Sequence, residues 1–237
     1  MRKLNIKDIP LAINICDQML REVDKNSEWS TAHVLMNPSA WSLLHKHLKM
    51  HEVYIITQGQ GDLIVGNNAL RVQAGNAVLI SPRQQHKLSN TGVVSLEHLV
   101  LAIPPFDPTD VLLVDEQYEP FSGFAPYNLP PIQECFDGAK IIPYTFPEIN
   151  TSIAFGWVIN DPKRHKAAHY HKITREWAFI VEGNGFVEIN GNNVPIAKGD
   201  WIQIEPEEFH AFRNNNDQYM VVVCICTPVF TMNDVYY

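Results

Sequence analysis

Histidine and glutamate recur in this sequence as two groups with the same internal spacing. In each group two histidines are separated by one residue, a glutamate follows five residues later, and a third histidine lies 34 residues beyond the glutamate. The groups are His45, His47, Glu52 and His86, and His169, His171, Glu176 and His210. Three imidazoles and one carboxylate are typical ligands of Fe, Mn, Ni, Zn or Cu, whereas calcium prefers sites rich in oxygen. The sequence therefore predicts two divalent metal sites, each with positions left open for a substrate.

The spacing also indicates what must position these side chains. Two residues separated by one position leave the same face of a β-strand, so His45 and His47 are expected to point the same way. Glu52 has the opposite parity, and a turn at 48–50 must bring it in from the next strand. His86 must arrive from a third strand.

The two groups belong to a duplicated unit. When the sequence is shifted by 124 residues, 14 of the 62 positions from 45 to 106 are identical, and most of these are His, Glu, Gly, Pro or Asn. A stretch rich in proline and aromatic residues, 118–131, separates the copies and reads as an extended connector. We therefore expect two domains, residues 1–120 and 121–237.

Short β-branched and apolar runs dominate each copy and are punctuated by glycine and asparagine. Examples are 53–57 and 96–103, and Asn190-Gly191 is a typical hairpin turn. The pattern predicts an all-β fold of sandwich or barrel type. One short helix is expected at 17–24.

The repeated pattern resembles the two sequence motifs of the cupin family. The first motif runs from His45 to Gly59 and from His169 to Gly183, and the second from Gly75 to Asn90 and from Gly199 to Asn214. The resemblance implies two tandem jelly-roll β-barrels with one metal near the centre of each, as in small two-barrel isomerases and dioxygenases. Two turn positions where the family has glycine depart from the pattern in both copies. The first holds Ser39 and Lys163, and the second holds Arg83 and Glu207.

Strand alternation extends the prediction beyond the metal ligands. Counting from Glu52 places Tyr54 inside the first barrel, where it is a candidate substrate contact or a core tyrosine. His165 is a second candidate for the substrate site or an exposed loop histidine. Trp177 and Phe179 should face outward from the second barrel, which favours packing against another barrel or another chain, and a homodimer is expected on this ground.

Composition excludes several classes of function. The net charge of −8 and the absence of clustered Lys and Arg argue against nucleic-acid binding. No run of 18 apolar residues predicts a membrane span, and the N-terminus lacks the apolar core of a signal peptide, so a cytoplasmic protein is expected. The four cysteines match no zinc motif and are expected to be core residues.

Three functions remain open at this stage. The first is an isomerase, epimerase or decarboxylase of a small oxygenated metabolite, with the metal as a Lewis acid. The second is an Fe-, Mn- or Ni-dependent dioxygenase, which would use the same ligands. The third is a non-catalytic protein that binds a metal or a small ligand.

Overall fold

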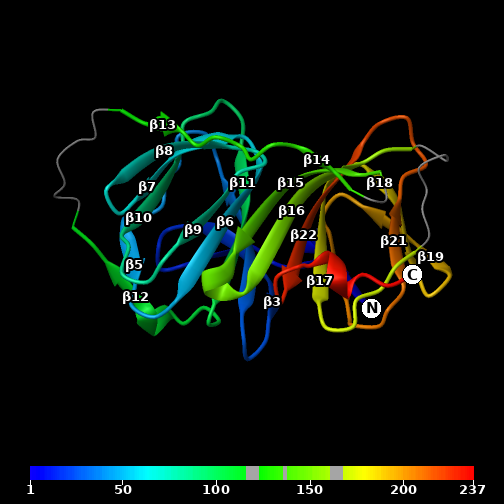
Figure 1. Cartoon of the computed structure of the whole chain (residues 1–237). Helices are drawn as coiled ribbons and strands as arrows, with labels where there is room; N and C mark the ends of the chain where they lie inside the picture. The colour runs from blue at the N-terminus through cyan, green and yellow to red at the C-terminus, as the bar shows by residue number, and fades with distance from the viewer. Residues whose placement is uncertain (116–122, 136–137, 161–167) are drawn as a thin grey trace. The chain divides into compact units, whose positions relative to one another are not determined.

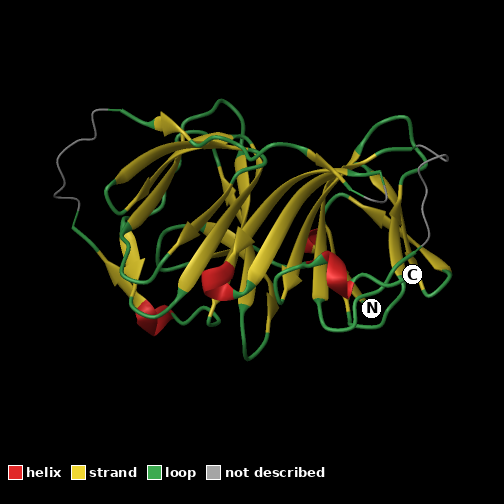
Figure 2. Cartoon of the chain, in the orientation of Figure 1, coloured by secondary structure: helices red, strands yellow, loops and turns green. Residues whose placement is uncertain are grey.

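The computed structural model describes residues 1–115, 123–135, 138–160 and 168–237. Within these ranges the chain consists of short strands joined by loops and single-turn 3-10 helices (Figure 2). Two compact units emerge: the N-terminal barrel, Ile9–Leu129, and the C-terminal barrel, which comprises Met1–Asp8 and Pro130–Tyr237. No helix in the described ranges is long and apolar enough to cross a membrane.

The N-terminal barrel consists of two six-stranded sheets (Figure 1). One sheet has the strand order β12-β5-β10-β7-β8-β13, and the other has the order β2-β3-β4-β11-β6-β9. The strands are β2 (Ala12–Ile13), β3 (Met19–Lys25), β4 (Ser30–Met36), β5 (His45–His47), β6 (His51–Gln58), β7 (Gln60–Val65), β8 (Asn68–Gln73), β9 (Ala77–Ile80), β10 (His86–Asn90), β11 (Leu96–Ile103), β12 (Val111–Leu113) and β13 (Ala125–Pro126). A 3-10 helix, η2 (Pro108–Asp110), precedes β12.

The C-terminal barrel also has two sheets. Their strand orders are β1-β20-β17-β22-β16-β15-β14 and β19-β18-β21. The elements are β1 (Arg2–Asn5), η1 (Ile6–Asp8), β14 (Gln133–Glu134), β15 (Lys140–Phe146), η3 (Pro147–Ile149), β16 (Thr151–Val158), β17 (Arg175–Glu182), β18 (Asn184–Ile189), β19 (Asn192–Ala197), β20 (Asp200–Ile204), β21 (His210–Arg213), β22 (Met220–Thr227) and η4 (Met232–Asp234). The expected hairpin turn at Asn190-Gly191 joins β18 to β19, and both residues have positive φ, as a tight hairpin requires.

Strand alternation sets the inner face of each barrel, as predicted. Tyr54 and Ile56 belong to the apolar core of the N-terminal barrel, and Ala178 and Ile180 belong to that of the C-terminal barrel. Trp177 has the opposite parity and is nevertheless only 2% exposed. The inward assignments from the two glutamates are therefore confirmed, and the outward direction of Trp177 stays a prediction.

The expected domain limits need one correction. The first eight residues belong to the C-terminal barrel, because β1 pairs antiparallel with β20 from Arg2↔Gln203 to Asn5↔Asp200. Side chains reinforce this pairing, since Asn5 Nδ2 donates to Asp200 Oδ1 over 2.8 Å. This contact joins residues far apart in the sequence, so the order of the chain gave no sign of it. The expected boundary at residue 120 lies outside the described residues.

The expected helix at 17–24 is wrong. The segment forms β3, which pairs antiparallel with β4 from Met19↔Leu35 to Lys25↔Ser30. Helix propensity in a short segment is a weak preference, and pairing with an adjacent strand satisfies the same backbone groups while burying Val23.

Three of the four residues that replace a glycine of the cupin pattern lie in the described part of the chain, and they keep a left-handed backbone. Ser39, Arg83 and Glu207 have φ of 65°, 69° and 68°. The last two turns also support the metal-site strands, because Arg83 N donates to His47 O over 2.6 Å and Glu207 N donates to His171 O over 2.7 Å. The turns therefore keep their shape at the expense of an unfavourable conformation for a residue with a side chain.

A buried aspartate holds the loop after each pair of histidines. Asp110 Oδ2 accepts from Lys49 N over 3.2 Å and from Met50 N over 3.1 Å. In the C-terminal barrel Asp234 accepts from the backbone N–H groups of 172–174 over 2.9 to 3.3 Å. Burial acts to raise the pKa of Asp234, but the hydrogen bonds from Thr174 and its neighbours outweigh burial and lower it. The two aspartates are 124 residues apart, so this support is part of the duplication.

Replacing Arg83 or Glu207 by glycine should stabilise the protein. Relief of the left-handed strain, about 1–2 kcal/mol, exceeds the entropic cost of glycine, about 0.5–1 kcal/mol. We expect Arg83→Gly and Glu207→Gly each to raise the free energy of unfolding by about 0.5–1 kcal/mol, measured by urea denaturation. The alanine variants keep a Cβ and should show no gain. Glycine variants no more stable than the alanine variants would contradict this account of the turns.

Replacing Asp234 by asparagine should destabilise the folded protein in a pH-dependent way. The lowered pKa means that the carboxylate contributes stability above its unfolded value of about 3.9 and loses this contribution as the pH falls through the folded value. We expect Asp234→Asn to cost about 1–3 kcal/mol at pH 7. The difference from the parent protein should shrink in urea titrations below pH 4. Asp217→Asn, at an exposed position, is the control and should change stability little at either pH.

Candidate metal centres

The four residues of the first group converge inside the N-terminal barrel. His45 and His86 are directly paired across β5 and β10, and their ring centroids lie 4.1 Å apart. His47 leaves the same face of β5, and the ligand atoms of His45, His47, Glu52 and His86 all lie within 4.8 Å of one another. All four side chains are buried, so the donors point into the barrel rather than to solvent.

Glu52 reaches this group from the opposite sheet. The turn predicted at 48–50 is present, and it carries the chain from β5 in one sheet to β6 in the other. Glu52 Oε2 then lies 3.4 Å from His47 Nε2 and 3.0 Å from His86 Nε2. The carboxylate therefore closes a site whose imidazoles all come from the facing sheet.

Backbone carbonyl groups orient several of the imidazoles. His45 Nδ1 lies 2.8 Å from Leu43 O, and His86 Nδ1 lies 3.1 Å from Gln84 O. In the C-terminal barrel, His171 Nδ1 lies 2.9 Å from Asp234 O, and His210 Nδ1 lies 2.9 Å from Glu208 O. A carbonyl can only accept, so each Nδ1 carries the proton and each Nε2 is left with its lone pair free for a metal.

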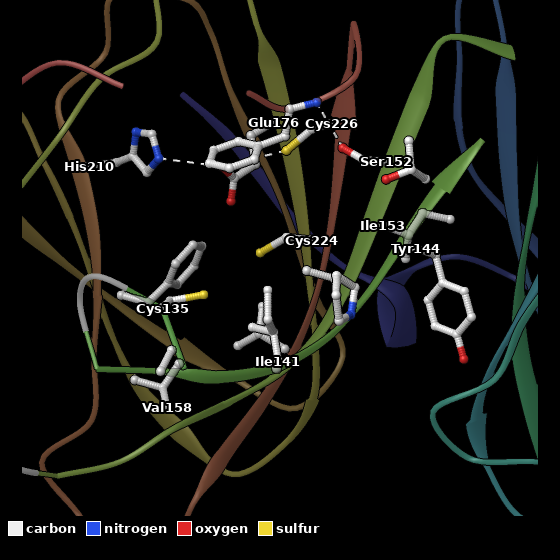
Figure 3. Close-up of a pocket in the computed structure, with 18 of the residues that line it drawn as sticks. Cys135, Ile141, Tyr144, Ser152, Ile153, Val158, Glu176, His210, Cys224 and Cys226 are labelled. Atoms are coloured by element: carbon white, nitrogen blue, oxygen red, sulfur yellow. Dashed lines mark hydrogen bonds and ion pairs between the residues drawn. The ribbon is translucent and has the colours of Figure 1, made fainter. Parts of the chain in front are cut away.

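The C-terminal barrel repeats the arrangement with a wider carboxylate spacing. The ligand atoms of His169, His171 and His210 lie within 4.8 Å of one another. Glu176 Oε2 lies 3.7 Å from His171 Nε2 and 3.5 Å from His210 Nε2. The same oxygen is 4.0 Å from the thiol of Cys226, which lies beside Glu176 in Figure 3. Burial, and then the nearby Glu176, raises the pKa of the Cys226 thiol well above its usual value.

A terminal strand segment supports the histidine pair in each barrel. β12 pairs with β5, with Leu112 opposite Lys46. The equivalent in the C-terminal barrel is the end of the chain, where Tyr170 and Tyr236 exchange two backbone hydrogen bonds of 2.9 and 3.0 Å. In both copies the residue between the two histidines is thus paired through its backbone with a neighbouring strand segment.

The donor sets fit divalent transition metals. His47 Nε2, His86 Nε2, His171 Nε2 and His210 Nε2 are buried and have no hydrogen-bond partner among the described residues. Buried polar atoms normally have a hydrogen-bond partner. Two buried nitrogen atoms without one in each barrel therefore indicate metal ligands. Burial lowers the pKa of His45 and of His169 to about 3, so both imidazoles are neutral at pH 7, as metal ligation requires.

The two glutamates supply the negative charge of the sites. Burial acts to raise the pKa of the Glu52 carboxyl, but His47 and His86 outweigh burial and hold it well below the usual range. His171 and His210 have the same effect on Glu176. Each barrel therefore offers one negative charge beside three imidazoles, which suits Fe, Mn, Ni, Zn or Cu in the divalent state.

The two predicted substrate contacts have different outcomes. Tyr54 is buried at 1% exposure, with its ring 5.8 Å from that of His86 and 4.9 Å from that of His98. Burial, and then the charge of Glu52, raises the pKa of Tyr54, so its hydroxyl keeps its proton. A contact between Tyr54 and a substrate stays a prediction. His165 lies outside the described residues.

Sequence reasoning missed a buried histidine in the N-terminal barrel. His98 lies on β11 and is fully buried, and neither ring nitrogen has a hydrogen-bond partner in the part of the chain that the structure describes. Burial, and then the nearby His33, lowers the pKa of His98 to about 3. Its parity with the core residues Leu96 and Val100 was the available signal. Asp110 and Asp234 were also missed, although extending the comparison of the two copies by four residues would have found them.

Comparison with known proteins agrees with the geometry. A family model described as a cupin domain matches residues 32–102 and 156–226. An uncharacterised protein of Methanocaldococcus jannaschii is 31% identical over 91 residues, which cover 38% of this chain and 73% of that protein. A Streptomyces cyaneus polyketide synthase is 29% identical over 79 residues, which cover 33% of this chain and 51% of that protein.

Solved structures with two barrels superpose on nearly the whole chain. The oxalate decarboxylase of Bacillus subtilis matches with a TM-score of 0.69 and 14% identity, covering 98% of this chain and 77% of that protein. A formate complex of the Lactobacillus farciminis oxalate decarboxylase matches with a TM-score of 0.72 and 17% identity, covering 97% of this chain and 87% of that protein. At these identities the likeness shows the fold. Because the family model covers more than half of the sequence, in two copies, the chain belongs to the cupin family and carries two cupin domains in tandem.

Proposed function

We propose that this protein is a metalloenzyme that binds one divalent transition metal in each barrel and acts on a small oxygenated metabolite. The observation that carries the proposal is the set of buried, unsatisfied Nε2 atoms around a carboxylate in each barrel. Four protein ligands leave two positions on an octahedral ion, which is enough for a substrate to bind through two oxygen atoms. We favour an isomerase, epimerase or decarboxylase reaction.

The protein and the metal have separate roles in this reaction. When bound, the metal supplies Lewis-acid stabilisation of negative charge on a substrate oxygen. The three imidazoles and the glutamate would hold it in place, and the carbonyl groups behind Nδ1 keep several of the rings oriented. The surrounding barrel excludes water, which strengthens electrostatic interactions at the reacting atoms.

The relatives are compatible with an oxygenated organic substrate and with manganese. Two of the solved structures are oxalate decarboxylases, and one study of the Bacillus subtilis enzyme concerns its Mn(II) centres. A dioxygenase would use the same donor set, and a binding protein would use it without turnover. These two alternatives are outcomes of the experiment that follows.

Metal analysis combined with paired assays tests the proposal. Protein as purified is analysed for metals, reloaded with Mn or Fe, and incubated under argon and under air with small oxo and hydroxy acids. Conversion under argon, followed by NMR, supports the Lewis-acid reaction. Conversion that occurs only in air, with oxygen uptake, would identify a dioxygenase. Ligand binding without conversion under either gas would favour the non-catalytic alternative.

Single substitutions should empty one site at a time. The parent protein is expected to hold two metal ions per chain after reloading. His47→Ala should remove the ion of the N-terminal barrel and His171→Ala that of the C-terminal barrel, so each variant should retain one. His51→Ala is the control, because His51 is adjacent to Glu52 but outside the donor group. Two ions retained in either ligand variant would contradict the assignment of the sites.

The proposed assembly and location are tested separately. We propose a homodimer in the cytoplasm, as expected from the sequence, although Trp177 and Phe179 are buried within the single chain and would not form its interface. Light scattering of the metal-loaded protein measures the mass directly, and a monomer across the micromolar range would contradict the dimer.

A further inference from the structure

The cavities of the two barrels differ in size and in chemistry, although the donor sets are the same. The cavity of the C-terminal barrel has a volume of about 210 Å³ and reaches His169, Glu176 and His210. The cavity of the N-terminal barrel, about 100 Å³, reaches Glu52. Polar side chains line part of the smaller cavity, among them Asn14, Gln18, Glu22, Ser30 and Thr31. The larger cavity therefore has room for the metal-binding end of a substrate and also for a further part of the substrate.

The wall of the larger cavity is apolar. Beyond the metal donors it is formed mainly by aliphatic, aromatic and thiol side chains, including Ile141, Val158, Phe212, Val222 and Phe230. Figure 3 shows Cys224 and Cys226 directed from β22 toward the same space. Among the described residues that line this cavity there is no lysine, arginine or aspartate, and the only glutamate is Glu176.

Small residues on β16 and β22 make the space. Ala154 lies opposite Cys224 in the register of the two strands. Two positions further along β16 is Gly156, where a Cβ would come within 3.2 Å of Ile141 Cγ2. The residue equivalent to Cys224 in the N-terminal barrel is Val100, which lines the smaller cavity. The difference between the barrels thus lies in the wall and not in the ligands.

Charge balance limits what can enter the larger cavity. A divalent metal with one glutamate and neutral imidazoles has a net charge of +1, which matches a single negative charge on a ligand. A second carboxylate would lie against the apolar wall without a cation among the described residues. Burying an unpaired charge is strongly unfavourable, whereas an apolar substituent gains free energy when it leaves water.

We infer that the C-terminal barrel binds a singly charged 2-oxo acid, or an enolate of the same charge, that chelates the metal through two oxygens and carries an uncharged apolar substituent. This inference rests on the proposed metal-dependent function and specifies the substrate class of one of its two sites. It also separates this site from a ligand such as oxalate, whose two carboxylates carry two charges and no apolar group.

Two oxo acids with tails of similar length but different charge provide the test. We would titrate Mn-loaded protein by calorimetry with 4-methyl-2-oxopentanoate and with 2-oxoglutarate, and repeat both titrations with pyruvate and oxalate. The branched oxo acid should bind at least about tenfold more tightly than 2-oxoglutarate and than pyruvate, because only its tail fills the apolar space without burying a charge. Equal or tighter binding of 2-oxoglutarate or oxalate would overturn the inference.

Matched variants assign the binding to one barrel. Cys224→Phe should fill the cavity and weaken binding of the branched oxo acid at least about tenfold without loss of metal, whereas Val100→Phe, the same change in the N-terminal barrel, should leave that affinity unchanged. Ala154→Leu is a milder filling variant that covers the case in which Cys224→Phe does not fold. Unchanged affinity in the folded filling variants would overturn the inference.

Metal analysis of the same samples separates the two proposals. Two bound ions with no preference for the apolar ligand would overturn the inference alone. Protein that takes up no metal would overturn the proposed function, and the inference with it.

Discussion

The structure depends on a carboxylate that is buried beside three imidazoles between two sheets. In the N-terminal barrel the three histidines come from one sheet and the glutamate from the other, and in the C-terminal barrel His210 and Glu176 lie in different sheets, with His169 bridged to His210. The sites therefore exist only when the sheets are closed over each other. A buried charge of this kind is costly unless it is paired. The imidazoles and their carbonyl partners prepare a position for a cation, and the barrel supplies the rigid frame that keeps these polar groups aligned.

The supports around the donors are duplicated together with the donors. An aspartate accepts from the loop after the histidine pair, a left-handed turn donates to the carbonyl of the second histidine, and a strand segment pairs with the residue between the histidines. The last support comes from β12 in one copy and from the final residues of the chain in the other. These contacts involve the backbone, so they survive differences in side chains between the copies.

Differences between the barrels lie in the walls of their cavities. Val100 and Ala102 face the smaller cavity, and the equivalent residues, Cys224 and Cys226, face the larger one. Tyr54 and His98 occupy inner positions of the N-terminal barrel where the C-terminal barrel has Ala178 and Val222. The same donor set thus faces a smaller cavity whose lining includes a second glutamate, Glu22, and a larger cavity in which Glu176 is the only charged carboxylate among the described lining residues. This contrast is the physical basis for assigning different ligands to the two barrels.

The sequence alone determined the duplication, the all-β fold, the donor residues and the faces of the strands that carry them, because metal ligation and strand alternation leave regular spacings. It misplaced the first eight residues, because strand pairing between distant segments leaves no local pattern. It also predicted a helix at 17–24 where a strand pairs with its neighbour, because the local preference of a short segment is weak. Only the tertiary structure decided that Glu52 crosses to the opposite sheet, that His98 lies buried near Tyr54, and how large and how polar each cavity is. Those properties arise from the packing of many side chains at once, which spacing along the chain cannot specify.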